Sequence, residues 1–280
     1  MVQIVKRVEL NPTVTLLEIE APLVAAKAKP GQFIILRVDE AGERIPLTIA
    51  DTDVGRGVVT IIFQIVGATT EKLNRLRVGE FLCDFVGPLG KATELDGLKK
   101  VAVVGGGVGC AIAYPVAKAL YQAGAEVDAI VGFRSRDLVI LQKEFESHST
   151  RFFLMSDDGS AGEKGLVTDA LRQLLEAGNR YDEVITIGPL VMMKFVSQLT
   201  KEFGIKTVAS MNPIMIDGTG MCGGCRLTVG GETKFACVDG PDFDAHLIDF
   251  DEAMERASMY RPFEQNAREK ACRLYRKEEN

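Results

Sequence analysis

The sequence predicts an antiparallel β-barrel, then an α/β domain with a parallel sheet, then a small region rich in cysteine and glycine. Three observations predict this order. Short alternating segments fill the first third of the chain, strand and helix patterns alternate in the middle, and three of the six cysteines gather near the end. The 280 residues, 46% of them hydrophobic and 26% charged, are enough for two globular domains and an appendix.

The first predicted domain, residues 1–96, is rich in strand patterns and forms the barrel. Its β-branched or alternating segments are Val14–Ile19, Gln32–Val38, Gly57–Val66 and Glu80–Val86. Turn residues such as Pro30-Gly31 separate these segments. Only Thr70–Leu76 has a helical pattern, so we expect one short helix in this domain.

The second predicted domain, residues 97–210, alternates strands with helices. The expected strands are Val101–Val104, Glu126–Val131, Arg151–Met155, Glu183–Ile187 and Thr207–Ser210. The expected helices are Ala111–Ala123, Leu138–Glu146, Leu166–Ala177 and Met192–Phe203. Such alternation predicts a parallel sheet with helices on both faces, which is the architecture of nucleotide-binding α/β domains.

Charge and hydropathy exclude several classes of protein. The net charge of −6 leaves no broad basic surface for nucleic acid. No apolar run approaches the roughly 20 residues that cross a bilayer, and the N-terminus lacks the pattern of a signal peptide. We therefore expect a cytoplasmic protein with no nucleic-acid or membrane partner.

The third predicted region, residues 211–280, lies outside both domains and contains the cysteine cluster. Asp217, Cys222, Cys225 and Cys237 follow the plant-type [2Fe–2S] spacing C-x4-C-x2-C with a distant fourth ligand, except that aspartate replaces the first cysteine. Glycines between them allow backbone amides to approach a cluster. Two alternatives remain: three thiols and an aspartate also suit zinc, and Asp217 is also a typical turn residue. An acidic helix is expected at Asp244–Tyr260, before Pro262.

A glycine turn joins the first strand of the second domain to its helix. Its glycines are Gly105, Gly106, Gly107 and Gly109, and such a turn lets a pyrophosphate approach the N–H groups of the helix N-terminus. A tight turn without a ligand is the alternative. Two other loops also follow strands and therefore share the carboxyl edge of the sheet, where ligands bind. Their candidate residues are Asp157, Asp158, Gly159, Ser160, Gly188, Pro189 and Met192.

In the first domain, Arg44–Thr48 ends a strand and Val66–Lys72 leads into the predicted helix. Hydroxyl and amide groups at a helix N-terminus suit a phosphate. Thr69 or Thr70 could equally be an ordinary helix cap.

The order of barrel, nucleotide domain and C-terminal [2Fe–2S] loop resembles the ferredoxin–NADP reductase superfamily, in its branch of dihydroorotate dehydrogenase electron-transfer subunits. Aspartate at 217 makes it most similar to the small subunits of NADH-dependent reduced ferredoxin:NADP oxidoreductases. The resemblance implies an FAD site made by Ile45, Pro46, Leu47, Thr48, Ile62, Phe63, Gln64, Thr69 and Thr70. The family's flavin-motif arginine is replaced by Ile45, and Arg44 stands one place early. The glycine turn and its two neighbouring loops match the family's nicotinamide face.

The implied function is electron transfer between NAD(H), FAD and the [2Fe–2S] cluster in an electron-bifurcating enzyme. The implied partner is a larger flavo-iron–sulfur subunit that reacts with ferredoxin and NADP(H). No acid–base residue is required, because the cofactors supply the chemistry. Arg134 and Arg136 follow the second strand and suit a 2′-phosphate, whereas the resemblance favours NAD. A dihydroorotate dehydrogenase subunit and a zinc-binding nucleotide sensor are the alternatives.

Overall fold

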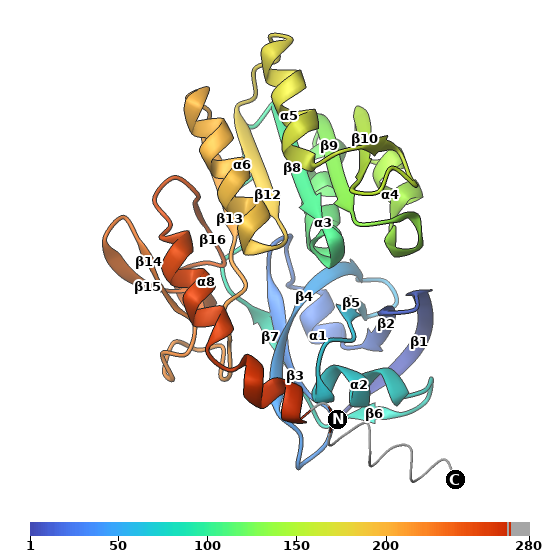
Figure 1. Cartoon of the computed structure of the whole chain (residues 1–280). Coiled ribbons are helices and arrows are strands. Elements are labelled where there is room, and N and C mark those ends of the chain that lie inside the picture. The colour runs from blue at the N-terminus through green and yellow to red at the C-terminus, as the bar shows by residue number, and fades with distance from the viewer. Residues whose placement is uncertain (268, 270–280) are drawn as a thin grey trace.

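The computed structural model describes residues 1–267 and 269 and contains two seven-stranded sheets and a two-stranded sheet (Figure 1). Cys272, in the charged C-terminal segment, lies outside the described residues. Within them, no helix is long and apolar enough to cross a membrane. The first sheet and its helices comprise β1 (Val2–Asn11), β2 (Val14–Glu20), α1 (Pro22–Ala25), β3 (Phe33–Arg37), β4 (Arg44–Asp53), β5 (Val58–Gln64), α2 (Ala68–Arg75), β6 (Phe81–Leu82) and β7 (Asp84–Leu89).

The first sheet is antiparallel and curves into a nearly closed barrel. Its strand order is β6-β1-β2-β5-β4-β3-β7. The two strands at the ends of this order, β6 and β7, are separated in sequence only by Cys83. One continuous segment therefore pairs with β1 at one end and with β3 at the other, which draws the sheet edges together. The predicted barrel is confirmed, and side chains such as Leu17, Ile34 and Phe63 fill its interior.

The second sheet has the order β11-β10-β9-β8-β12-β13-β16. All neighbouring strands are parallel except β13 and β16. The chain winds outward from β8 in both directions, so a topological switch point lies between β8 and β12. The strands are β8 (Lys100–Gly106), β9 (Glu126–Phe133), β10 (Arg151–Ser156), β11 (Glu163–Lys164), β12 (Glu183–Ile187), β13 (Thr207–Ser210) and β16 (Asp242–Asp244).

Helices cover both faces of this sheet, as the strand–helix alternation predicts (Figure 1). On one face, α3 lies between the sheet and the barrel, and its residues share a core with Val14, Ala50 and Ile62. This position explains why α3 is apolar nearly all round. On the other face, α5 and α6 pack in a separate core. The helices are α3 (Cys110–Gln122), α4 (Gln142–Ser147), α5 (Val167–Glu176) and α6 (Leu190–Glu202).

The C-terminal region packs against both domains. Its core contains Phe33 and Ile35 from the barrel and Met193 and Ala209 from the α/β domain. Strand β16 extends the large sheet by pairing antiparallel with β13, so this part of the region is integrated into the second domain. The remaining elements are β14 (Arg226–Val229), β15 (Glu232–Phe235), α7 (Ala236–Asp239) and α8 (Phe250–Ser258).

The acidic helix is shorter than the sequence predicts. It begins at Phe250 because Asp249 caps it, with its carboxylate accepting a hydrogen bond of 2.9 Å from the Glu252 N–H. The residues from 244 to 249 form the end of β16 and a turn instead. Residues 261–267 are helical again, with Pro262 in the first turn, where its missing N–H has no cost.

Candidate functional site: two nucleotide loops and a cysteine loop

The loops that follow β8 and β12 meet at the switch point of the parallel sheet. A Cβ atom added at Gly109 would lie 2.6 Å from the Gly188 Cα atom, so neither position has space for a side chain. A Cβ atom at Gly106 would clash with the Met192 sulfur and lie 3.1 Å from the Pro189 ring. The predicted residues of these two loops are therefore in direct contact, and most of the glycines permit that contact.

Gly107 differs from its neighbours. Its φ of +54° is a left-handed conformation, and a Cβ atom there would meet nothing within 4 Å. Packing therefore does not explain this glycine, and its open side lies at the start of the short 3-10 helix 107–109 that leads into α3. A backbone turn open to solvent, at a helix N-terminus and at a switch point, fits a dinucleotide pyrophosphate.

The third loop on this edge is held by its own hydrogen bonds. Ser160 donates its hydroxyl to the Asp158 carboxylate at 2.6 Å, and this bond lowers the pKa of Asp158. The Ser160 hydroxyl also accepts from the Arg136 backbone N–H at 2.8 Å. The Arg136 guanidinium donates to the Ser160 carbonyl at 2.7 Å. The loops after β9 and β10 are thus connected by two hydrogen bonds between Arg136 and Ser160.

The predicted flavin segment Ile45–Thr48 lies in β4 and has a free edge. Residues 44–48 pair only with β3, whereas the rest of β4 pairs with β5 from Ile49 onward. Pro46 is tolerated because its position faces this free edge, where no ladder hydrogen bond is required. All four residues are half-buried. A half-buried strand edge of this kind fits a flat ligand such as a flavin ring.

The two threonines at the start of α2 have different roles. The Thr70 hydroxyl accepts hydrogen bonds of 3.0 Å from the N–H groups of Val66 and Gly67 and donates to the Gly67 carbonyl. Thr70 is thus a helix cap, the alternative that the sequence left open. The Thr69 hydroxyl donates to the Glu43 carboxylate at 2.7 Å. A Cβ atom at Gly67 would meet nothing within 4 Å, so the positive end of this helix is open.

Replacing Thr70 by valine tests this difference. The variant keeps the side-chain volume but loses all three hydrogen bonds, and we expect a loss of about 1–2 kcal/mol in unfolding free energy, as for other N-terminal caps. Thr69→Val removes only the exposed bond to Glu43 and is expected to change stability by less than about 0.5 kcal/mol. Thermal unfolding of both variants checks this, and equal stabilities would contradict the capping role.

The remaining predicted flavin residues alternate across β5. Phe63 is buried in the barrel interior, whereas Ile62 faces the core around α3. Gln64 is half-buried at the end of the strand. The Phe63 side chain therefore holds the barrel together, and only its backbone remains available to a ligand.

A tight hairpin brings two of the cysteines together. Gly230 and Gly231 join β14 to β15 with φ values of +62° and +81°, the geometry of a type I′ turn. The pairing places Cys225 opposite the start of α7, where the Cys237 N–H lies 3.5 Å from the Cys225 sulfur. Both thiols are buried, and burial beside Cys225 raises the pKa of Cys237 to about 12. Cys222, in contrast, is exposed.

Asp217 lies in the same loop as an ionised, preorganised carboxylate. Its two oxygens accept hydrogen bonds of 3.0 Å each, one from the Thr219 N–H and one from the Cys222 N–H. These bonds, the Thr219 bond foremost, lower the pKa of Asp217. Among the described residues, no three His, Cys, Asp or Glu side chains are grouped as a single metal ion requires. A [2Fe–2S] cluster takes four ligands over two irons. Asp217 and the three thiols offer four ligand groups from one region, in which Asp217 bonds the Cys222 backbone and Cys225 adjoins Cys237.

Sequence reasoning missed one contact of this loop. The Arg44 side chain donates to the carbonyl of Ile216, the residue before Asp217, across 172 positions of sequence. In the sequence, only the position of Arg44 next to the flavin segment indicated a role for it.

A pocket of about 300 Å³ between β4 and α3, lined by Asp51 and Lys118 among others, coincides with none of the predicted sites. His148 and His246 bond to nearby hydroxyl groups, those of Ser147 and Thr200.

Comparisons with known proteins agree with this arrangement. Residues 212–249 match the iron–sulfur cluster binding domain of dihydroorotate dehydrogenase B. A Clostridium beijerinckii protein of unassigned function is 50% identical over 95% of this chain and 93% of its own length. The Thermotoga maritima homologue of the dihydroorotate dehydrogenase B (NAD(+)) electron transfer subunit is 46% identical over 92% of this chain and 91% of its own length.

A solved structure of NADH-dependent reduced ferredoxin–NADP oxidoreductase, described for flavin-based electron bifurcation, is also similar. It superimposes with a TM-score of 0.91 at 43% identity and covers 96% of both chains. A ferredoxin reductase of carbazole 1,9a-dioxygenase, at 18% identity and a TM-score of 0.62 over 73% of this chain and 64% of its own, shares the fold alone. The chain therefore belongs to the family of dihydroorotate dehydrogenase B electron transfer subunits and their homologues.

Proposed function

We propose that this chain transfers electrons between NAD(H), FAD and a [2Fe–2S] cluster, as a subunit of an NADH-dependent reduced ferredoxin–NADP oxidoreductase. The observation that carries the proposal is the docking of the cysteine loop on the strand that carries the flavin segment, through the Arg44 contact with Ile216. The 43% identity to the bifurcating enzyme over nearly the whole chain supports the same assignment.

The residues of this chain bind and orient the cofactors and supply no proton-transfer group. The turn at Gly107 would hold the dinucleotide pyrophosphate, and the free edge of β4 at Ile45–Thr48 would hold the flavin. Asp217, Cys222, Cys225 and Cys237 would ligate the cluster. Bound at these residues, FAD would supply hydride and single-electron chemistry, and the cluster would supply single-electron transfer. The close contact of Gly109 with Gly188 leaves no room for a side chain at Gly109, next to the turn that would hold the nucleotide.

NAD(H) is the proposed nicotinamide cofactor. The Arg136 Nε–H group donates to the Ser160 carbonyl at 2.7 Å. Arg134 and Arg136 together therefore offer fewer free donors to a 2′-phosphate than the sequence suggests. Arg134 is exposed at the same edge of the sheet. Comparing flavin reduction by NADH and by NADPH tests the preference, and faster reduction by NADPH would reverse it.

A second candidate is the electron transfer subunit of a dihydroorotate dehydrogenase. The family match of residues 212–249 favours it. The aspartate at position 217 favours the bifurcating type instead. The branch of dihydroorotate dehydrogenase electron-transfer subunits, which this chain resembles, has four cysteines in this loop. Anaerobic co-purification decides between the two: a larger flavo-iron–sulfur partner supports the main proposal, and a dihydroorotate-oxidising partner supports the second.

Spectroscopy of the purified chain tests the cofactor assignment directly. We expect yellow-brown absorption from flavin and cluster, bleaching on NADH addition, and a paramagnetic signal from the reduced cluster. A colourless protein containing zinc would contradict the proposal, because zinc has no redox chemistry or visible absorption.

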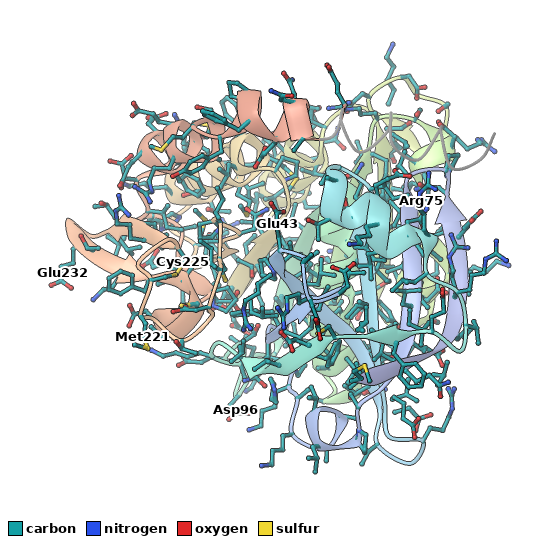
Figure 2. The ribbon with its side chains drawn as sticks, turned by 90° about the horizontal axis from the view of Figure 1, so that it is seen from below. Glu43, Arg75, Asp96, Met221, Cys225 and Glu232 are labelled. Carbon is teal, nitrogen blue, oxygen red and sulfur yellow. The ribbon has the colours of Figure 1, made fainter. Side chains whose placement is uncertain are left out.

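The surface around the cysteine loop suits a protein partner. Its exposed apolar side chains are Ile214, Ile216, Met221 and Val238, of which Met221 is 88% exposed. Met221 and Cys225 both lie in the C-terminal region, to one side of the barrel (Figure 2). Exposed apolar groups beside a redox centre fit a contact with the proposed larger subunit, which receives the electrons there.

Met221→Glu tests this surface. We expect it to weaken binding of the larger subunit by at least about tenfold, since burying an unpaired charge costs several kcal/mol. Val54→Glu, at another exposed apolar position on the barrel, is the control and is expected to bind normally. Titration calorimetry or gel filtration measures both, and undiminished binding by Met221→Glu would move the interface elsewhere.

A further inference from the structure

Arg44 bridges the flavin strand and the cysteine loop. It is the first residue of β4 and stands directly before the predicted flavin segment. Its Nε–H group donates to the Ile216 carbonyl at 3.1 Å, and its Nη1 atom lies 3.7 Å from the Asp84 carboxylate. Ile216 immediately precedes Asp217. A cationic side chain of the flavin strand thus bonds the backbone beside the proposed aspartate ligand.

The other side of Asp217 is also fixed to the barrel. Gly218 has a φ of +75°, and an added Cβ atom would lie 2.8 Å from the Leu89 Cδ1 atom and 3.0 Å from the Ile35 Cγ1 atom. Only glycine permits this close approach to β3 and β7. The residues before and after Asp217 are therefore both anchored on the barrel, by two independent contacts.

Asp84 orients Arg44 together with a second arginine. Arg37 donates to the Asp84 carboxylate at 2.7 Å, and this bond raises the pKa of Arg37. Arg37 and Arg44 lie opposite each other in the pairing of β3 with β4. The two arginines thus share one carboxylate, but only Arg44 bonds the cysteine loop. The rigid fork of a guanidinium allows it to hold two partners in one geometry.

We propose that Arg44 is a positioning residue for electron transfer between the flavin and the cluster, and that it does not bind the flavin pyrophosphate. The proposal rests on the function proposed above. Arg44 fixes the loop of Asp217 against the strand that holds the flavin, and so sets the separation of the two redox centres. Its positive charge beside an anionic cluster also favours the reduced state of that cluster.

Arg44→Gln in the intact, cofactor-loaded chain tests the proposal, with Arg37→Gln as the matched control. For Arg44→Gln we expect unchanged flavin content, a lower cluster reduction potential and slower reduction of the cluster by the NADH-reduced flavin. The equilibrium constant for opening of the cysteine loop is expected to increase on the order of tenfold, the size that follows from losing a hydrogen bond to a charged group. Arg37→Gln removes a bond to the same Asp84 but keeps the Ile216 contact, so its potential and loop opening should stay close to wild type.

Three measurements give these results: potentiometric titration followed by electron paramagnetic resonance, stopped-flow absorbance, and hydrogen exchange of the Thr219 and Cys222 amides. Loss of flavin from Arg44→Gln would show that Arg44 is a flavin ligand and overturn the proposal. A wild-type potential together with wild-type loop opening in Arg44→Gln would also overturn the proposal. Equal changes in Arg44→Gln and Arg37→Gln would overturn it too. The wild-type chain separates this failure from failure of the proposed function, because only the latter leaves it without a reducible cluster and flavin.

Discussion

Gly107→Val is expected to abolish most NADH-dependent reduction of the flavin while the flavin stays bound. The added side chain meets no protein atom near its Cβ position and instead enters the open side of the turn, where the pyrophosphate must approach. Displacing the nicotinamide by about 1 Å is enough to lower the rate about 100-fold. Stopped-flow bleaching of the flavin at increasing NADH concentrations measures the effect.

Gly124→Val provides the control for backbone strain. Gly124 follows the other end of α3, has a φ of +88°, and also has nothing within 4 Å of an added Cβ atom. Both variants therefore carry a similar cost of a branched side chain in a left-handed conformation, but only one lies at the nucleotide turn. Equal losses of NADH reactivity in the two variants would remove the assignment of a nucleotide site to Gly107.

Asp217→Asn is expected to lose or strongly destabilise the [2Fe–2S] cluster. Asparagine keeps the size of the side chain and the oxygen that accepts from the Thr219 N–H, so the turn itself survives, although the second bond, from the Cys222 N–H, is lost. A ligand would not, because the neutral amide is a poor ligand for iron. Iron analysis and visible absorption measure cluster content, and an intact cluster in this variant would show that Asp217 serves the turn alone.

Asp217→Cys is expected to keep the cluster and lower its reduction potential. Carboxylate and thiolate carry the same charge, but a thiolate donates more electron density and favours the oxidised iron. The bonds that Asp217 accepts from Thr219 and Cys222 must adjust to a sulfur atom, so some loss of cluster stability is also expected. Potentiometric titration decides the point, and an unchanged potential and spectrum would argue against ligation by Asp217.

Local patterns in the sequence were sufficient for the order of elements. The strands Glu183–Ile187 and Thr207–Ser210 have the bounds that their apolar pattern predicts, because buried parallel strands are short apolar runs between turn residues. The glycine turn was also predictable, since a strand, a glycine run and a helix follow one another directly. The cysteine spacing predicted an iron–sulfur loop that the family match to residues 212–249 confirms.

Long-range pairing could not be predicted in the same way. The acidic C-terminal segment carries a helical pattern from Asp244. Asp244 is nevertheless the last residue of β16, because its backbone pairs with β13, which is distant in sequence. Similarly, barrel closure depends on one segment, residues 81–89, pairing with two different strands. Hydrophobic periodicity reports which face of an element is buried, but it contains no information about the partner.

The sequence by itself determined the fold class, the glycine turn and the ligand spacing, because each depends on residues that are neighbours along the chain. Only the tertiary structure decided which candidate side chains are free for a ligand. It assigned Thr70 to the cap of α2, Phe63 to the barrel interior and Arg44 to the cysteine loop. A hydroxyl, a ring or a guanidinium has the same identity in each role, and its role is fixed by the atoms that folding brings within hydrogen-bonding or packing distance.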